Sequence, residues 1–402
     1  MRNPKPRAAC ARASAEGVER KPLGRLKRGL PAAWYRDLVH YERELEAFWY
    51  RGWIAACREE ELPGPGDWKA CKLGSQSIFV LRNSKRELKA FHNVCRHRGS
   101  VLCTAQTGNF ARERIVCPYH SWTYDLKGRL VATPRRMQTP DFDEKNFSLY
   151  EVAVRTWSGF VFVCLSRKTP RFTPPDKFAN HRIQDLRTGK RIVVDVKANW
   201  KLLAENFAEC FHCPPVHPEL CRVVTAYREA GAWGLRGKED LPEYKKGAKT
   251  LTMDGTSRLP PFRNLGAKER ATLYIPWMLP PNLFLNVQPD YVNSHMMFPT
   301  GPESVRIVYD WLFEPGHMPK GADLDRYTAL WEVTNRQDAR NCEWQQQGIQ
   351  SREFKHGHYV PQEFDCHRFA EWVRSTLLAA PAGRDGPSPT LRSRTASRRR
   401  TG

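Results

Sequence analysis

Two short cysteine–histidine pairs constrain the fold of this 402-residue chain more than any other feature of its sequence. Cys95 and His97 form a C-x-H pair, and Cys117 and His120 form a C-x-x-H pair. Zinc binds two thiolates and two imidazoles, but zinc fingers place both cysteines before both histidines. A two-iron, two-sulfur cluster with thiolates on one iron and imidazoles on the other suits two loops that each supply one Cys and one His. The alternating order therefore favours the iron–sulfur cluster, with zinc as the competing interpretation.

A second group of metal-binding residue types occurs in NWKLLAENFAECFHCPPVHPEL, residues 199–220. Helix-forming composition predicts a helix over 199–213, which places Glu209 and His212 on one face. The following Pro-Pro pair cannot continue a helix, so the chain can turn there and direct His217 to the same metal. Two His and one carboxylate on one face of an iron are the ligands of non-haem Fe(II) oxygenases. The carboxylate is either Glu209 or an acid from another segment.

Cys210 and Cys213 form a C-x-x-C pair within the same segment. This spacing occurs in redox-active dithiols, but no βαβ pattern surrounds it here. The twelve cysteines are too sparse for a disulfide scaffold and are typical of a reducing compartment. We therefore favour metal binding for the clustered cysteines, and we interpret Cys103, near the first pair, as a buried thiol.

The residues around both cysteine–histidine pairs resemble a known family. The segments CRHRGSVLC and CPYHSWTYDLKGRL are similar to the two signature boxes of Rieske oxygenases, including Trp122, Tyr124 and Gly128 after the second pair. The resemblance implies a [2Fe-2S] cluster. It implies two thiolate ligands on one iron, Cys95 and Cys117, and two imidazole ligands on the other, His97 and His120.

The second segment resembles the E-N-x-x-E/D-x-x-H-x-x-x-x-H box of the same family. This resemblance implies that His212 and His217 bind a mononuclear Fe(II). The stretch NRQDARNCEWQQQG resembles the late helix that supplies the family's third ligand, which implies Asp338 as the carboxylate ligand. Glu209 is then the acid that joins the two metal sites. It would accept one hydrogen bond from His212 and one from a cluster histidine of a neighbouring subunit, with His120 favoured.

Composition and periodicity divide the chain into four segments. Residues 1–31 and 380–402 are basic and lack hydrophobic periodicity, which predicts disordered extensions. Residues 32–165 begin with an amphipathic helix pattern over 32–50 and continue with short β-like runs. Residues 166–379 contain helix and strand patterns in separate blocks, so we expect an α+β fold.

The resemblance to Rieske oxygenases extends over roughly residues 33–375. It implies a β-rich Rieske [2Fe-2S] domain and a catalytic mononuclear iron domain, in which helices wrap an antiparallel sheet. In the second domain, periodicity predicts strands over 283–298 and 304–313 and helices over 322–350 and 363–379. The resemblance also implies a homotrimer, with the cluster of one subunit beside the iron of the next.

The excess of Lys and Arg behind the formal net charge of +22 lies largely in the two predicted disordered extensions. A zinc-stabilised nucleic-acid-binding protein would therefore depend on its least structured parts, and we place it behind the oxygenase. The sequence contains no apolar run of roughly 18 residues and no secretory signal pattern. We predict a protein without membrane spans that is cytoplasmic, or located in an organelle stroma if the N-terminal extension is a transit peptide.

The predicted activity is that of the terminal oxygenase component of a Rieske system. The chain has no G-x-G-x-x-G fingerprint, so electrons must come from an NAD(P)H-dependent reductase or a ferredoxin. The box ENFAECFHC…HPEL most resembles the branch that acts on betaine-type ammonium compounds, which favours oxidative N-demethylation over aromatic ring hydroxylation as a dioxygenase. Cation–π attraction to a methylammonium makes aromatic residues candidates for the substrate site: Phe207, Phe211, Tyr274, Trp277 and Phe284.

Overall fold

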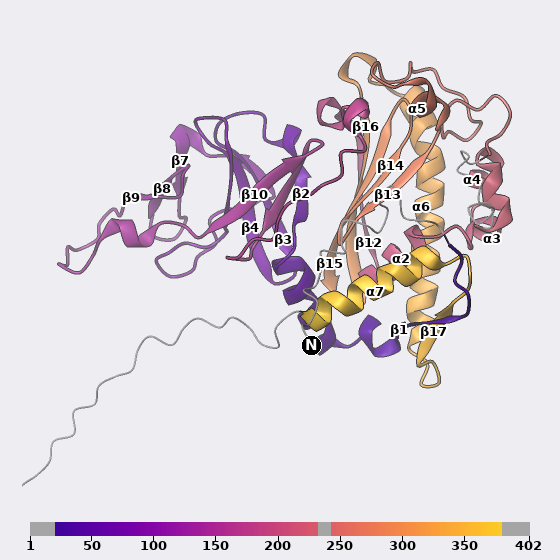
Figure 1. The fold of residues 1–402 in the computed structure, drawn as a ribbon. Coiled ribbons are helices and arrows are strands. Elements are labelled where there is room, and N and C mark those ends of the chain that lie inside the picture. Colours follow the sequence, from indigo (N-terminus) through magenta and orange to yellow (C-terminus); the bar gives the residue numbers. More distant parts are fainter. Residues whose placement is uncertain (1–20, 232–242, 380–402) are drawn as a thin grey trace, which may run out of the picture.

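The computed structural model describes residues 21–231 and 243–379. They form two parts, a β-rich part in indigo to magenta and a mixed part of helices and sheet that contains most of the remaining chain (Figure 1). The α+β class, the β-rich first part and the antiparallel sheet of the second part are confirmed. The predicted extensions lie outside the described residues over 1–20 and 380–402.

The prediction of disorder through residue 31 is wrong for Lys27–Pro31. This segment forms strand β1, which pairs antiparallel with β17 (His356–Tyr359), and Lys27 lies opposite Tyr359. Leu30 in the middle of β1 is buried in the main core. The partner strand lies near the other end of the described chain, so local sequence periodicity does not reveal the pairing.

The predicted helix over 32–50 is present but divided. A 3-10 turn, Ala32–Tyr35, precedes α1 (Leu38–Glu44), which continues as a π-helical turn, Leu45–Tyr50. The break falls at Asp37, because its carboxylate accepts the backbone N–H of His40 at 2.7 Å and so caps α1.

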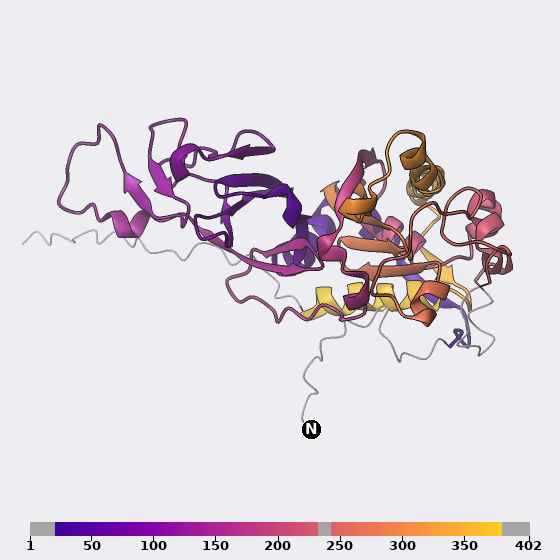
Figure 2. The same cartoon turned by 90° about the horizontal axis from the view of Figure 1, so that it is seen from above.

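Two antiparallel sheets make up the β-rich part. Their orders are β2-β11-β10-β5-β4-β3-β6 and β7-β8-β9. The strands are β2 (Ile54–Arg58), β3 (Asp67–Leu73), β4 (Gln76–Arg82), β5 (Leu88–His92), β6 (Thr107–Asn109), β7 (Arg114–Val116), β8 (Thr123–Asp125), β9 (Leu130–Ala132), β10 (Glu151–Trp157) and β11 (Phe160–Cys164). In both views the small β7-β8-β9 sheet lies at the end of the molecule away from the helices of the mixed part (Figures 1 and 2).

The sequence of strand β4 is a continuous apolar run rather than an alternation of apolar and polar residues. Ile78 and Val80 pack into the main core, whereas Phe79 and Leu81 point to the opposite face. That second face belongs to a small core beneath the two cysteine–histidine loops. Burial on both faces of a strand removes the polar positions that alternation would require.

The mixed part is built on a five-stranded antiparallel sheet of order β12-β16-β15-β14-β13. The predicted strand over 283–298 is interrupted at Gln288–Tyr291, and the strand over 304–313 is confirmed. The strands are β12 (Arg187–Val196), β13 (Ile275–Leu279), β14 (Leu283–Val287), β15 (Val292–Gly301) and β16 (Ser304–Phe313).

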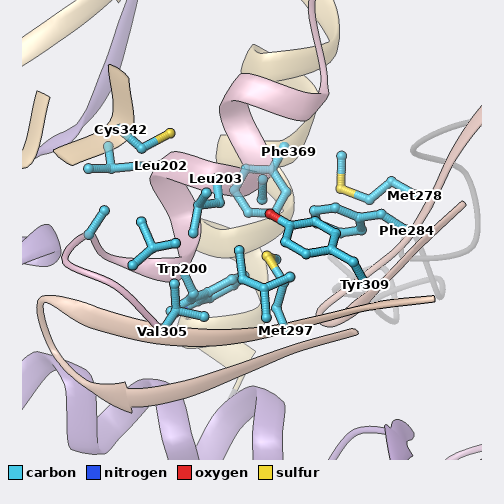
Figure 3. Close-up of a cluster of buried hydrophobic side chains, with 14 of the residues drawn as sticks. Trp200, Leu202, Leu203, Met278, Phe284, Met297, Val305, Tyr309, Cys342 and Phe369 are labelled. Carbon is cyan, nitrogen blue, oxygen red and sulfur yellow. The ribbon is translucent and has the colours of Figure 1, made fainter. Parts of the chain in front are cut away.

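Helices cover this sheet and carry the second predicted site. They are α2 (Trp200–Phe207), α3 (Cys213–Val216), α4 (Pro218–Val223), α5 (Ala267–Ala271), α6 (Ala322–Ile349) and α7 (Phe364–Ala379). Helix α2 packs against α6, α7 and β15. In Figure 3, Trp200 and Leu203 of α2 meet Met297 of the sheet and Phe369 of α7, so this core fixes α2 relative to the sheet. None of the described helices is long and apolar enough to cross a bilayer.

Candidate metal centres and active site

Two loops of matching geometry carry the predicted cluster residues. One loop follows β5, and the other joins β7 to β8. In each loop the cysteine carbonyl accepts an N–H from four residues later, from Gly99 to Cys95 at 3.1 Å and from Ser121 to Cys117 at 3.0 Å. Gly99 and Ser121 both have positive φ, 76° and 57°. The left-handed residue closes each loop and leaves the intervening histidine at its tip.

The donor atoms of these loops divide by burial. Cys95 and Cys117 are 3% and 2% exposed and their thiols are in hydrogen-bonding contact, whereas His97 and His120 are exposed with ring centroids 4.7 Å apart. The Tyr124 hydroxyl lies 3.2 Å from Cys95 Sγ. Burial raises the pKa of the Cys95 thiol, so a bound cation is needed to keep Cys95 as a thiolate. Two inner sulfurs and two outer imidazoles fit a [2Fe-2S] cluster with mixed ligands.

The box residues after the second pair support these loops. Trp122 stacks on His97, with ring centroids 4.8 Å apart, and Tyr124 is fully buried beneath Cys95. Gly128 has φ 80°, and a Cβ there would lie 2.4 Å from the Phe91 ring. Glycine at this position therefore follows from both backbone conformation and packing.

The second site forms where α2 ends. Helix α2 stops at Phe207, earlier than the sequence predicts. The Glu209 carboxylate then accepts the backbone N–H groups of Phe211 and His212, which reverses the chain. The Pro-Pro pair lies in the first turn of α3, where its missing N–H groups cost nothing. His217 lies between α3 and α4, so its ring returns toward that of His212.

Three predicted ligand atoms converge at this turn. The Nε2 atoms of His212 and His217 are 3.1 Å apart. Asp338 Oδ1, from the middle of α6, lies 2.9 Å from His217 Nε2 and 3.4 Å from His212 Nε2. Among the residues that the structure describes, this is the only group of three or more potential ligands within 4.8 Å of one another. Two imidazoles and one carboxylate that face one point fit a single ferrous ion.

The outer nitrogen of each imidazole has its own acceptor. His212 Nδ1 donates to Glu209 Oε1 at 2.5 Å, and His217 Nδ1 donates to Gln337 Oε1 at 2.8 Å. The Gln337 amide in turn donates to Glu219 at 3.0 Å, which fixes the oxygen of the amide toward the histidine. Such outer hydrogen bonds set the tautomer and leave both Nε2 lone pairs for a metal.

In the metal-free site, a protonated His212 is paired with the ionised carboxylates of Asp338 and Glu209. Burial disfavours a charged imidazole, but hydrogen bonds to Asp338 and Glu209 outweigh burial and raise the pKa of His212 to about 10. Burial also disfavours an ionised Asp338, but hydrogen bonds from His212 and His217 hold its pKa well below the ordinary value. A divalent ion bound here would replace the shared proton, so metal affinity should increase with pH.

Known protein families and relatives match most of this chain. The family described as "Rieske [2Fe-2S] domain" matches residues 52–143, and the family described as "Ring hydroxylating alpha subunit (catalytic domain)" matches residues 183–379. The glycine betaine monooxygenase oxygenase subunit of Chromohalobacter salexigens is 30% identical over 402 residues, covering 90% of this chain and 88% of that relative. The chain belongs to the Rieske oxygenases.

Two further proteins are similar to this chain. The carnitine monooxygenase oxygenase subunit of Acinetobacter pittii is 28% identical over 337 residues, covering 81% of this chain and 86% of that relative. A crystal structure of the quaternary ammonium Rieske monooxygenase CntA shares the fold, with TM-score 0.70, 23% identity and coverage of 87% of this chain and 95% of that chain. This Rieske oxygenase is therefore an oxidoreductase with a [2Fe-2S] cluster and a mononuclear iron. It is the oxygenase component of a system that needs a reductase or ferredoxin.

The Rieske oxygenase has a cavity of about 210 Å³ beside the ligand triad. Phe207 of α2, Tyr274 before β13 and Trp331 of α6 supply aromatic walls. Phe207 and Tyr274 were expected there from the sequence, but Trp331 was not. The other three predicted aromatics do not line the cavity, since one is 43% exposed and two pack in the cores: Phe211, Trp277 and Phe284.

The sheet side of the cavity is polar and hydrogen-bonded. The Tyr274 hydroxyl donates to Asn286 Oδ1 at 2.9 Å, and His295 Nε2 donates to Asn293 Oδ1 at 2.7 Å. Burial lowers the pKa of His295 to about 3, so its imidazole is neutral. Sequence reasoning missed Asn286, Asn293 and His295, because a polar residue within an apolar strand pattern has no local feature that marks a cavity.

A second cavity of about 330 Å³ lies on the other side of the His212–Glu209 pair. Glu205, Tyr359 and other residues line it, and His212 and Glu209 line both cavities. The hydrogen-bonded pair therefore forms part of the wall between the two spaces.

Proposed function

We propose that this Rieske oxygenase carries out oxidative N-demethylation of a methylammonium, betaine-like compound with O2. The observation that carries the proposal is the predicted ligand triad beside a cavity whose aromatic lining includes Phe207, Tyr274 and Trp331. Aromatic faces attract a quaternary ammonium by cation–π interaction. Relatives named for glycine betaine and carnitine support the same substrate class.

The proposal assigns the metal ligands residue by residue. Cys95, His97, Cys117 and His120 hold the cluster, and the triad of His212, His217 and Asp338 holds the mononuclear iron. Bound there, the cluster supplies single electrons and the iron supplies the site of oxygen activation. The burial of the two thiols and the 2.9–3.4 Å spacing of the triad atoms support these assignments.

The remaining residues of the site orient the ligands and shape the cavity. Glu209 and Gln337 hold the Nδ1 protons of the two histidines, so both rings present Nε2 to the metal. The aromatic walls exclude water from the substrate and orient its methylammonium group toward the triad. Glu209 is not a metal ligand in this proposal, because its Oε1 is engaged by His212 Nδ1.

We further propose a homotrimer in which electrons cross between subunits. The β7-β8-β9 sheet, next to the cluster loops, lies at the end of the molecule away from α6 in both views (Figures 1 and 2). In the proposed trimer, a second subunit brings its cluster close to the triad. Glu209 lines the second cavity, which supports its role as the acceptor for the neighbour's His120.

The electron donor and location complete the proposal. We expect an NAD(P)H-dependent reductase or a ferredoxin as the redox partner, and cytoplasmic location, or an organelle stroma if the N-terminal extension that precedes β1 is a transit peptide. The basic surface would attract an acidic partner, so the coupled rate should decrease with added salt.

Product analysis tests the substrate class. Iron-loaded enzyme with a reductase should release formaldehyde from one or more compounds in a panel of methylammonium compounds, in step with O2 consumption. Formation of phenols or cis-diols from aromatic hydrocarbons, without formaldehyde from any methylammonium compound, would instead establish ring hydroxylation. A colourless zinc protein would contradict both.

A further inference from the structure

The charged groups that line the substrate cavity balance once a ferrous ion is present. Among the described residues, three carboxylates line the cavity, those of Glu209, Asp338 and Asp365, and one guanidinium, that of Arg368. Histidines that bind a metal are neutral. The 2+ charge of the ion therefore brings the lining to zero net charge. Such a cavity accepts a molecule without net charge at a lower electrostatic cost than a cation.

Arg368 is the single Lys or Arg on the described cavity wall, and it has spare hydrogen-bonding capacity. Its Nη2 donates to Asp365 one turn earlier in α7. Its Nε is buried and has no hydrogen-bond partner among the described residues. The guanidinium carbon lies 5.5 Å from the centre of the Phe364 ring, which also lines the cavity. A buried N–H without an acceptor is costly, and an incoming carboxylate would supply one.

We infer that Arg368 binds the carboxylate of a zwitterionic substrate whose methylammonium group lies against the aromatic walls. The inference rests on the proposed function, from which it takes the methylammonium chemistry. It adds that the site selects ammonium carboxylates over ammonium alcohols. An alcohol such as choline has the same trimethylammonium group but lacks an anion for Arg368, and it brings an uncompensated positive charge into the cavity.

Binding of two ligands that differ at this one group tests the inference. Calorimetry on anaerobic, iron-loaded holoenzyme should give a lower Kd for glycine betaine than for choline. Arg368→Gln should weaken glycine betaine binding about ten- to a hundredfold, the range for a hydrogen bond to a charged group, and choline binding less than about threefold. Arg368→Lys keeps the charge but loses the planar fork, so we expect an intermediate loss confined to glycine betaine.

The matched control is Arg352→Gln, which removes the same charge at an exposed position outside both cavities and should change neither Kd. Equal weakening of both ligands by Arg368→Gln, or no weakening of glycine betaine, would overturn the inference. If Arg368→Gln does not fold, the Lys variant is judged by the same criterion. A wild-type enzyme that neither binds nor demethylates any methylammonium compound would refute the proposed function itself, whatever Arg368 does.

Discussion

The two metal regions of this Rieske oxygenase are assembled in different ways. Each cluster loop supplies a Cys and a His within four residues, and both loops rest on one small core. The triad instead combines the turn over 212–217 with Asp338 of α6. Spacing along the chain therefore specifies the cluster site, whereas tertiary packing of α6 against α4 is needed to complete the triad.

The regions also differ in what they expose. His97 and His120 are exposed at the tips of their loops, while His217 is buried and His212 and Asp338 are half-buried beside the cavity. An exposed imidazole edge suits electron exchange with another protein. A largely buried triad beside a cavity suits control over which molecule reaches the metal. A mutation should therefore be able to disrupt either site without disrupting the other.

The largest expected effects come from breaking one region and leaving the other. His212→Ala should reduce turnover by more than about a hundredfold through loss of the mononuclear iron, because it removes one of three ligands. The reduced-state EPR signal of the cluster should persist. Cys117→Ala should give the reverse pattern, with no cluster signal but one iron per chain retained.

Cys103→Ala is the matched control for the cluster variant. Cys103 is 3% exposed in the same small core but is not a predicted ligand. Full cluster absorbance is expected in this variant. Loss of the cluster signal in both His212→Ala and Cys117→Ala would show that the regions fold as one unit and cannot be disrupted independently.

The same difference explains how much of the site was predictable. The loops at 95–97 and 117–120 could be identified from spacing and neighbouring residues alone. Asp338 had no feature of its own, since a lone acid in a long polar helix is ordinary, and only the family resemblance singled it out. Gln337 was missed because its role depends on the His217 ring, which the turn places beside it.

The second prediction separates positioning from electron transfer. Glu209 and Gln337 make the same kind of hydrogen bond to a histidine Nδ1, but only Glu209 lines the second cavity. Glu209→Gln should keep both metals yet lower steady-state turnover about a hundredfold. The neutral amide is a weaker hydrogen-bond acceptor than the carboxylate for the cluster histidine of the neighbouring subunit.

Gln337→Leu is the matched comparison. It should weaken iron binding about tenfold, while turnover per bound iron remains near wild type. Iron analysis and steady-state rates measure both quantities. Full activity of Glu209→Gln would rule out its role in the electron path.

The sequence predicts elements that have a clear local periodicity. It does not predict a strand whose pairing strand is distant along the chain. Helix α6 and strand β16 match their predicted ranges closely. Strand β1 lies in a segment that the sequence predicts to be disordered. Its pairing strand, β17, is far along the chain, so no local pattern indicates β1. Among the cavity aromatics, Phe207 was found but Trp331 was not, because its place on the cavity wall depends on how α6 packs over the sheet.

The third prediction concerns this aromatic wall. Trp331 Nε1 donates to the Tyr291 hydroxyl at 2.8 Å, so its ring is fixed against the cavity. Trp331→Leu should raise KM for a methylammonium substrate about three- to thirtyfold, because the substitution replaces a π face with an alkyl group. Trp344→Leu, on the exposed side of α6, should leave KM unchanged. Equal effects of both variants would contradict a cation–π contact.

The smallest expected effect lies in the wall of the second cavity. Glu205 is half-buried and accepts hydrogen bonds from the Tyr35 hydroxyl at 2.7 Å and the Tyr359 hydroxyl at 3.0 Å. Burial raises its pKa to about 7, although both tyrosines and Lys201 oppose the shift. Because the unfolded chain releases this proton at lower pH, the native state holds more protons between about pH 4.5 and 7. Stability should therefore decrease as pH rises through that window.

Glu205→Gln removes this titration and keeps the oxygen that accepts both hydroxyls. The variant should lose less stability than wild type between pH 5 and pH 8, by about 2–3 kcal/mol, since one pKa unit corresponds to about 1.4 kcal/mol. Denaturant melts of both proteins at the two pH values measure the difference, with exposed Glu353→Gln as the control. Parallel pH profiles for wild type and Glu205→Gln would mean that Glu205 is ionised in the native state, with Lys201 and the tyrosines outweighing burial. At Glu205, the lining of the second cavity would then carry a fixed negative charge rather than a neutral carboxyl group.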